Sequence, residues 1–302
     1  MRNIKDIAIL MSVYNGELYL REQLDSIINQ TFDNWTLYIR DDCSTDSSLS
    51  IIKEYLKYPN ITLFNDDLGN IGAKNSFFQL LKNIDSQYYM FSDQDDIWLP
   101  NKIQVSFERL KDEEAKSGEL CPILVCTDVY ITNAKLDIIE ESEWRLVGIN
   151  DNSFSSHIKM LVNPIVIGMT MCFNQLIKDN AFPINSNIGM HDSWLAYIAA
   201  KYGKIVNINK QLVLYRQHGN NVCGINNRRK LGLLYKVLHP KSSLQINLDK
   251  YNRIKKIESI SFIAYLYYKF CIIIQRKINK LKCKRYQIMI SFLYLNIYVF
   301  LI

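Results

Sequence analysis

The first hundred residues alternate between short apolar runs and longer stretches with hydrophobic residues at helical spacing. The apolar runs predict buried strands over residues 7–13, 35–40, 61–64 and 88–91. The helical spacing predicts helices over 17–30 and 47–57, one running through Phe77 to Ile84, and one starting at Pro100. This alternation predicts an α/β fold with a mainly parallel central sheet and helices on both faces.

Polar clusters follow three of these four strands, at Tyr14-Asn15-Gly16, Asp41-Asp42 and Asp93–Asp96. Because ligands of parallel sheets bind beyond the carboxyl ends of the strands, we expect the three clusters to form one site. The first strand is not followed by GxGxxG, which argues against a dinucleotide-binding dehydrogenase. It is also not followed by a glycine-rich loop with Arg and Lys, as a nucleotidyltransferase would require.

The acidic cluster after the fourth strand is the clearest candidate for a metal or ligand site. Residues 92–96 contain no apolar side chain, and three carboxylates within four positions repel one another unless water or a cation neutralises them. Asp93 and Asp95 point the same way along an extended backbone, so both can face one divalent ion or one ligand. An acidic turn that caps the next helix is the alternative.

Three segments of the second half add candidates. Residues 167–174 predict a strand with a glycine where a ligand can approach closely. Residues 189–194 precede an apolar helix that ends near Ala200, which puts Asp192 at its start. Residues 214–221 follow the last core strand and contain His218.

Taken together, four segments resemble glycosyltransferase family 2: Ser12–Gly16, Asp41–Asp46, Asn70–Gly72 with Asn75, and Asp93–Trp98. The Asp-Gln-Asp-Asp-x-Trp form is most similar to bacterial rhamnosyltransferases of that family. The resemblance covers residues 5–225 and implies a GT-A fold, which binds a nucleotide-sugar and a divalent metal. The Gln-x-x-Arg-Trp motif of processive members is absent, so we expect one sugar to be added per visit.

The resemblance implies roles in metal binding and proton transfer. Mg²⁺ or Mn²⁺ held by Asp95 would bridge the donor phosphates, and His218, which matches a metal-site histidine, would favour Mn²⁺. Asp192 matches the general base of a one-step inverting displacement. The alternatives are a loop histidine that bonds backbone, for His218, and a carboxylate paired with the helix dipole, for Asp192.

Other residues are candidates for the donor and substrate. Asp93 is expected at the ribose hydroxyls, and Asp41 or Asp42 at the imide N–H of the base, unless these two are only turn residues. The remaining donor candidates are Ser12, Tyr14, Asn15, Asn70 and Lys74. Possible substrate contacts are Asp96, Trp98, His191 and Arg216. The alternatives are core packing for Trp98, a structural role for His191, and solvated surface for Lys74 and Arg216.

Composition and charge divide the 302 residues into two parts. The hydrophobic fraction of 48% and the charged fraction of 22% are typical of a folded protein. The seven cysteines include no CxxC pair and no secretory leader precedes them, which favours reduced thiols in the cytoplasm. Residues 226–302 contain sixteen Lys or Arg and two acidic residues, a net charge of +14, whereas residues 1–225 carry −8. We therefore expect a catalytic domain over 1–225 and a basic, apolar helical region over 226–302.

Basic clusters in this C-terminal region alternate with aromatic and aliphatic runs, a pattern that suits the surface of an anionic membrane. Packing on the catalytic domain and a dimer interface are the alternatives. Nucleic acid is not expected, because the apolar runs require burial. The last 16 residues carry no charge but fall short of the roughly 20 that a spanning helix needs. We expect a peripheral protein on the cytoplasmic face of the plasma membrane, where polyprenyl-linked glycan acceptors lie.

The resemblance implies an inverting, metal-dependent glycosyltransferase that moves one sugar to a growing surface polysaccharide, and it alone suggests rhamnose from dTDP-rhamnose as the donor. A transferase that uses UDP-glucose or UDP-galactose is the second candidate. A non-catalytic membrane scaffold with a degenerate transferase domain is the third. The complete set of Asp41, Asp93, Asp95 and Asp192 argues against the scaffold.

Overall fold

The computed structural model describes residues 6–118, 120–219 and 240–283. The elements of the first half are β1 (Ile7–Val13), α1 (Leu20–Ile28), β2 (Trp35–Asp41), α2 (Ser48–Tyr55), β3 (Ile61–Leu63), α3 (Gly72–Asn83), β4 (Tyr88–Ser92), β5 (Ile97–Trp98) and α4 (Lys102–Ser117). Those that follow are β6 (Ile123–Thr132), β7 (Ile138–Glu140), α5 (Glu143–Val147), η1 (Asp151–Phe154), α6 (His157–Val162), η2 (Gly168–Thr170), β8 (Met171–Asn174), α7 (Gln175–Ala181), α8 (His191–Tyr202), β9 (Lys204–Arg216), α11 (Pro240–Lys255) and α12 (Phe262–Cys283).

One nine-stranded sheet runs through the molecule in the order β3-β2-β1-β4-β8-β6-β9-β5, with β7 paired to β6. β1 to β4 pair in parallel, as their alternation with helices predicts. β8 runs antiparallel to both β4 and β6, and β6 is parallel to β9. The predicted α/β architecture is confirmed, with a sheet that is parallel in its first half and mixed beyond β4.

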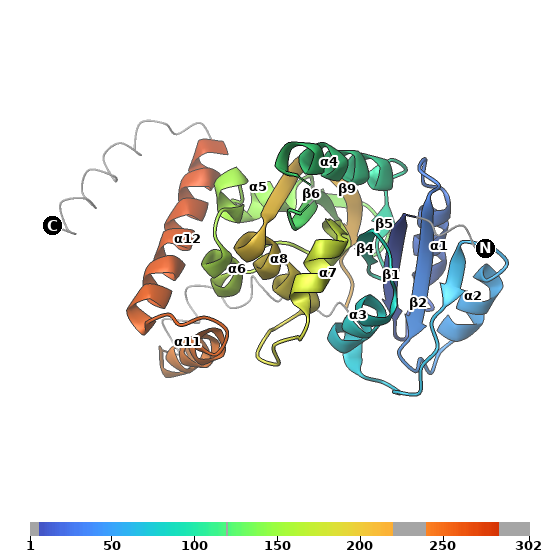
Figure 1. Cartoon of the computed structure of the whole chain (residues 1–302), viewed down its shortest axis with the longest axis horizontal. Coiled ribbons are helices and arrows are strands. Elements are labelled where there is room, and N and C mark those ends of the chain that lie inside the picture. Colours follow the sequence, from blue (N-terminus) through green and yellow to red (C-terminus); the bar gives the residue numbers. More distant parts are fainter. Residues whose placement is uncertain (1–5, 119, 220–239, 284–302) are drawn as a thin grey trace.

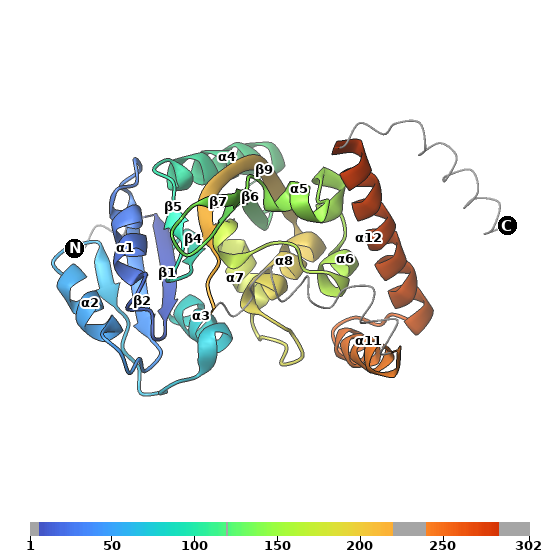
Figure 2. The same ribbon diagram turned by 180° about the vertical axis from the view of Figure 1, so that it is seen from behind.

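Alternate residues of the central strands pack into two separate hydrophobic cores, one on each face of the sheet. Ala8 and Leu10 pack with the apolar sides of α3, α7 and α8, whereas Ile9 and Met11 pack with those of α1, α2 and α4. β1 and β4 are therefore buried on both faces, which explains their continuous apolar sequences. Helices lie on both sides of the sheet in Figures 1 and 2.

Two element predictions need correction. Ile97 and Trp98 pair with β9, which keeps the chain extended after the acidic cluster, so α4 begins at Lys102 rather than at Pro100. Within 167–174 only β8 is a strand, because Gly168–Thr170 form a 3-10 turn closed by a 3.0 Å bond from Thr170 N to Ile167 O.

The C-terminal helices pack on the rest of the chain at the end remote from α2 (Figure 1). A small third core joins Ile158 and Val162 of α6 to Ile254 of α11 and Tyr265 of α12. Each helix in the described ranges is too short or too polar to cross a membrane. The predicted basic clusters at 228–230 and 282–285 lie wholly or partly outside the described residues, as does the uncharged segment 287–302.

Candidate active site

A cavity of about 710 Å³ lies where β1, β2 and β4 end. The sequence places polar side chains at these ends, and the parallel register brings them to one edge of the sheet. The predicted site residues that line the cavity are Ser12, Tyr14, Asn15, Asp42, Asn70, Asp93, Asp95, His191, Asp192 and His218. Asp41, Lys74, Asp96, Trp98 and Arg216 do not line it.

The Gln94 side chain connects the acidic cluster to the loop after β1 by hydrogen bonds. This role was not predicted from the sequence. Its Oε1 accepts from Tyr14 N at 2.8 Å, and its Nε2 donates to Tyr14 O at 3.0 Å. Gly16 lies against the same amide, since a Cβ at this position would be 2.7 Å from Gln94 Oε1. The polar side chain between two carboxylates was visible in the sequence, but its partner 80 residues earlier was not.

The loop after β2 forms hydrogen bonds with the same loop after β1. Asn15 N donates to Ser44 Oγ at 3.0 Å, and Asn15 Oδ1 accepts from Thr45 N at 2.8 Å. Asn15 and Cys43 have positive φ angles of 48° and 62°, so the backbone at both turns is set by these contacts. The two loops therefore form one rim of the cavity.

Asp41 and Asp42 have different environments. Both Asp42 oxygens are engaged, accepting from Ile71 N and Gly72 N at 2.8 Å each, and Oδ1 also accepts from the buried Arg40 guanidinium. Asp42 thus anchors the start of α3. Asp41 Oδ2 accepts from Ser44 N at 3.1 Å, whereas its Oδ1 is buried without a partner in the described structure. An unpartnered buried acceptor fits an N–H donor of a bound base.

Asp93, Asp95 and Asp192 bring three carboxylates to one cavity. Burial, together with the charges of Asp95 and Asp192, raises the pKa of Asp93 to about 7. Asp192 stands in the first turn of α8, where its Oδ1 accepts from Ser193 N and from Ser193 Oγ. A cation bound at this cluster would relieve the repulsion between its carboxylates.

Asp95 and His218 form the pair that the sequence predicted as metal ligands. His218 Nε2 lies 2.8 Å from Asp95 Oδ2, and the His218 ring packs on Tyr19 with a centroid distance of 4.7 Å. Within the described ranges, no three His, Cys, Asp or Glu side chains already converge to hold a metal ion. The pair nevertheless fits Mn²⁺ or Mg²⁺, since these ions take one or two protein ligands and complete their shell with phosphate and water.

Asp96 and Arg216 lie outside the cavity and support the acidic cluster that lines it. Asp96 is fully buried and its Oδ1 accepts from Arg216 N at 3.0 Å, while burial and the neighbouring Asp95 and Asp93 raise its pKa far above the usual range. The Arg216 side chain donates to Asp95 O at 2.8 Å and pairs with Glu22. Neither residue lines the cavity, so the substrate contacts predicted for them are not seen. The alternative prediction, that Arg216 lies on the solvated surface, is wrong, because this residue is 2% exposed.

Trp98 and Lys74 also lie away from the cavity. Trp98 is buried in the core, where the Lys102 amine lies 3.8 Å from the centre of its ring, in agreement with the packing alternative. Lys74 is half-buried on α3 and does not reach the cavity in this structure. Neither contacts the space available to a substrate.

His191 lines the cavity within an aromatic cluster. Its ring stacks on Phe77 at 4.1 Å and meets Phe91 edge-on at 4.9 Å. Burial lowers the pKa of His191 to about 4, so the imidazole is neutral at pH 7. Gly168 allows this position, because a Cβ there would lie 3.0 Å from His191 Nε2.

A second cavity of about 650 Å³ meets the first at Asp192. Ile167, Met190 and Tyr215 also border both cavities, and the second one extends from them to α12. Asp192 thus stands where two binding spaces meet. This second space was not predicted from the sequence, because its walls come from α5, the segment after α6, α8 and α12.

Comparisons with known proteins give a consistent picture. Residues 8–171 match the family described as Glycosyl transferase family 2. The chain is 31% identical over 231 residues to dTDP-rhamnosyl transferase RfbG of Shigella flexneri, covering 72% of this chain and 74% of that protein.

Two solved structures have similar folds. S. aureus TarS 1–349 in complex with UDP superposes with a TM-score of 0.52 at 18% identity, over 70% of this chain. Mannosyltransferase PcManGT from Pyrobaculum calidifontis, in complex with GDP-Man and Mn²⁺, gives 0.53 at 16% identity, over 72% of this chain. The chain spans 60% and 58% of these two solved chains.

Proposed function

The chain belongs to glycosyltransferase family 2 and is a glycosyltransferase, and from this premise we propose that it transfers a single rhamnose from dTDP-rhamnose to a lipid-linked surface glycan. The reaction would be an inverting, metal-dependent displacement. The observation that carries the proposal is the convergence of Asp93, Asp95, Asp192 and His218 on one cavity at the strand ends. The 31% identity to a dTDP-rhamnosyl transferase supports the donor.

The donor would lie along the edge of the sheet. Asp41 lies beside Asp42 of the cavity wall, and its buried Oδ1, which has no partner in the described structure, would accept from the imide N–H of thymine when the loop after β2 moves to admit the base. Asp93 would accept from the ribose hydroxyls, and Asp95 and His218 would hold Mn²⁺ or Mg²⁺ at the diphosphate. When bound, such an ion stabilises the charge that develops on the leaving diphosphate.

Asp192 would act as the general base. Among the described residues only its Oδ1 is engaged, by Ser193, which leaves Oδ2 for the proton of the acceptor hydroxyl. The acceptor oxygen bonds to the anomeric carbon as the bond from that carbon to the diphosphate breaks, and the proton moves to Asp192. Because Asp192 borders both cavities, the acceptor can approach from the side opposite the donor, as inversion requires.

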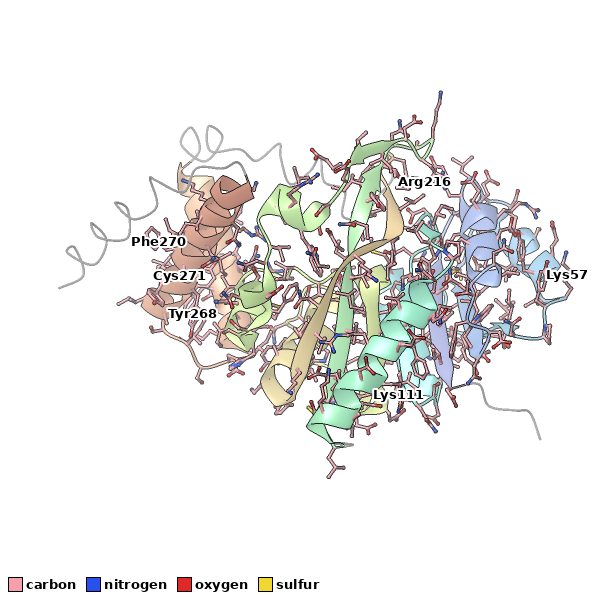
Figure 3. The ribbon with its side chains drawn as sticks, turned by 90° about the horizontal axis from the view of Figure 1, so that it is seen from above. Lys57, Lys111, Arg216, Tyr268, Phe270 and Cys271 are labelled. Atoms are coloured by element: carbon pink, nitrogen blue, oxygen red, sulfur yellow. The ribbon has the colours of Figure 1, made fainter. Side chains whose placement is uncertain are left out.

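Membrane contact would involve the outer side of α12. This side exposes large apolar residues at helical spacing, Ile263, Leu266, Tyr267 and Phe270, and the stripe continues to Ile273 at the second cavity. Figure 3 shows Phe270 at the end of the molecule opposite Lys57. An apolar stripe on a basic helix suits the surface of an anionic membrane, where a polyprenyl-linked acceptor is held.

UDP-glucose and UDP-galactose remain the second candidate for the donor. The imide edge is the same in uracil and thymine, so Asp41 Oδ1 would accept equally from either base. The donor sugar is therefore an experimental question.

A turnover assay would test the proposed function. The full chain would be incubated with each of the three donors, with Mn²⁺ or with EDTA, and with a lipid-linked glycan fraction. We expect nucleoside diphosphate release from dTDP-rhamnose that needs Mn²⁺, and a fall in turnover of about 10²–10⁴-fold in Asp192→Asn with the donor still bound. Asp179→Asn, an exposed carboxylate on α7, is the matched control.

Each other outcome has a definite meaning. Turnover of a UDP-sugar alone would replace rhamnose by the second candidate. Full turnover in Asp192→Asn would remove the base from its role. If no nucleotide-sugar is bound or consumed, the scaffold alternative replaces the enzyme.

A further inference from the structure

The second cavity has a strongly asymmetric lining. Its wall near α5 and α6 is apolar, with Val147 and Ile165, and Asp192 stands at its inner end. At its outer end α12 contributes Arg276, Lys277 and Lys280. One further carboxylate, the buried Glu143 of α5, also lines the space. A ligand here meets a general base at one end and three cations at the other.

The helix that carries these cations, α12, is held to the segment after α5 by polar contacts. Asn279 Nδ2 donates to Gly148 O at 2.9 Å, and Asn150 Nδ2 donates to Asn279 Oδ1 at 3.1 Å. Gly148 permits this close packing, because a Cβ there would lie 2.5 Å from Arg276 O. Lys277 and Lys280 are exposed, and in the described part of the chain neither forms an ion pair with a carboxylate.

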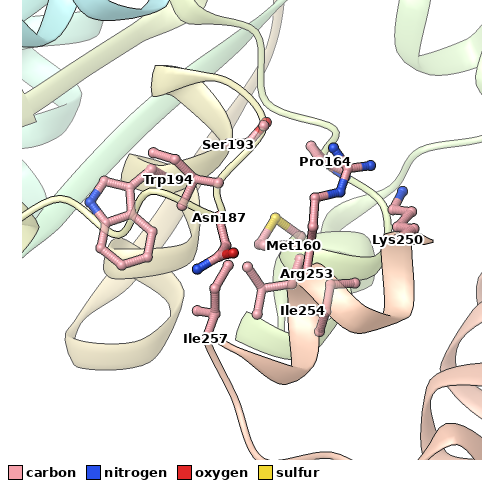
Figure 4. A pocket seen from close by; sticks show the side chains of 12 residues that line it. Met160, Pro164, Asn187, Ser193, Trp194, Lys250, Arg253, Ile254 and Ile257 are labelled. Atoms are coloured by element: carbon pink, nitrogen blue, oxygen red, sulfur yellow. The ribbon is translucent and has the colours of Figure 1, made fainter. Parts of the chain in front are cut away.

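A second set of cations on α11 lies beside the first. Lys250 and Arg253 line a smaller cavity of about 200 Å³ that shares Pro164 and Ser193 with the second cavity. In Figure 4 both side chains extend from α11 on the side of this cavity where Pro164 lies. Burial, followed by the charges of Lys269, Arg253 and Arg276, lowers the pKa of Lys250 to about 8. The junction of α11 and α12 therefore carries a concentrated positive charge.

We propose that the second cavity is the acceptor site, and that Arg276, Lys277 and Lys280 bind a phosphate or diphosphate group attached to the acceptor saccharide. The saccharide would occupy the apolar part of the cavity with one hydroxyl at Asp192. The inference rests on the proposed function, since Asp192 must activate that hydroxyl. Phosphate oxygens accept charge-assisted hydrogen bonds from Lys and Arg, which a neutral glycan cannot do at this end.

The same anionic chemistry has two sources. A polyprenyl diphosphate would place its phosphates at α12 and its lipid toward the exposed apolar stripe of that helix. A polymer with phosphodiester-linked repeats would place one phosphate there and continue into solvent. The cation site is the same in both cases, so both are included in the test.

The test measures binding without divalent metal, so that anions do not bind through a metal at the donor site. The full chain would be titrated in EDTA with farnesyl diphosphate and, separately, with a short glycerol phosphate oligomer. Lys277→Ala/Lys280→Ala would be compared with the control Lys255→Ala/Lys256→Ala. The control removes two exposed lysines at the end of α11, and neither of them lines a cavity. We expect the first double variant to bind its anion about tenfold more weakly or worse, and the second to bind as the wild type does.

The more tightly bound probe identifies the source of the phosphate. Equal affinity of the wild type and Lys277→Ala/Lys280→Ala for both probes, or no binding of either probe by the wild type, would overturn the proposal. Binding of dTDP-rhamnose with Mn²⁺, measured in parallel, should be the same in all three proteins. A wild type that binds the anions but no nucleotide-sugar would contradict the proposed function, and with it the acceptor role of this site.

Discussion

The aspartates of this site have different roles, and the surroundings of each side chain determine its role. Asp95 faces the cavity and meets His218, whereas its neighbour Asp96 is fully buried and holds the Arg216 backbone. The chain leaves β4 after Ser92 and bends at Gln94 and Asp95 before β5 begins, so the adjacent carboxylates of Asp95 and Asp96 have different surroundings. Asp93, Gln94 and Asp95 therefore line the cavity, whereas Asp96 lies outside it and holds the Arg216 backbone.

Lys102 is a buried cation outside the cavity. It is 0% exposed, its Nζ has no hydrogen-bond partner in the described structure, and it lies over the Trp98 ring. Burial lowers its pKa from 10.5 to about 7. Between these values the unfolded chain holds a proton that the folded chain has lost, so the free energy of unfolding rises with pH in this window.

We expect Lys102→Met to stabilise the protein at pH 7 and to flatten this pH dependence. The wild type should gain about 2–3 kcal/mol from this group between pH 7 and pH 9, because each unit of pH is worth about 1.4 kcal/mol. Below pH 7 both states are protonated and the folded state carries the full cost of the buried charge. Urea unfolding at pH 6.5, 7 and 9 would measure the difference between variant and wild type.

Lys255→Met, at an exposed position, is the control and should leave the pH dependence unchanged. Parallel curves for the wild type and Lys102→Met would show that Lys102 does not titrate in this window.

The sequence was sufficient to predict residues whose neighbours in the chain reveal their chemistry. Asp93, Asp95 and Asp192 stand at the ends of predicted elements, and all three line the cavity. The bracing contacts could not be predicted in the same way. Arg216 reaches Glu22 across nearly 200 positions, and a buried arginine in a polar segment has the same local pattern as a solvated one.

At the scale of elements, the strands that alternate with helices were predictable because their burial on both faces gives continuous apolar runs. β5 and β8 were harder, since a two-residue strand has no period and the turn at Gly168–Thr170 reads as apolar strand. The antiparallel position of β8 depends on pairing with β4 and β6, which a single sequence does not display.

α12 belongs to the region that was predicted to contact a membrane surface, to pack on the catalytic domain or to form a dimer interface, and its two sides differ. Tyr265 is buried in the core shared with α6, whereas Ile263 is 79% exposed and Phe270 is 53% exposed. Packing on the domain is therefore confirmed for one side of the helix. Membrane contact by the other side stays a prediction.

Replacing Ile263 and Phe270 by serine should weaken binding to vesicles that contain anionic phospholipid. Burying each of these side chains in lipid is worth about 1–3 kcal/mol, so the double variant should bind at least about tenfold more weakly. Sedimentation with anionic and with neutral vesicles would measure this. Ile138→Ser/Ile139→Ser, at two exposed isoleucines of β7, is the matched control. Equal sedimentation of all three proteins would exclude α12 as the contact.

At the scale of the whole molecule, the fold brings two cavities together at one carboxylate. The strand ends of the sheet supply the first cavity, and α5, the segment after α6 and α12 supply the second. The GT-A architecture expected from the sequence is confirmed by the family match and by the likeness to solved glycosyltransferase structures. The pairing of the cavities was not predictable, because it depends on how helices remote in sequence pack.

In the proposed function, Asp95 and His218 bind the donor through a divalent metal. Calorimetric titration of the full chain with dTDP-rhamnose, with Mn²⁺ or with EDTA, tests it most directly when repeated on Asp95→Asn and on the control Asp179→Asn. We expect binding that needs Mn²⁺, that weakens about tenfold or more in Asp95→Asn, and that is unchanged in Asp179→Asn. Equal donor affinity with Mn²⁺ and with EDTA, or an undiminished affinity of Asp95→Asn, would contradict it.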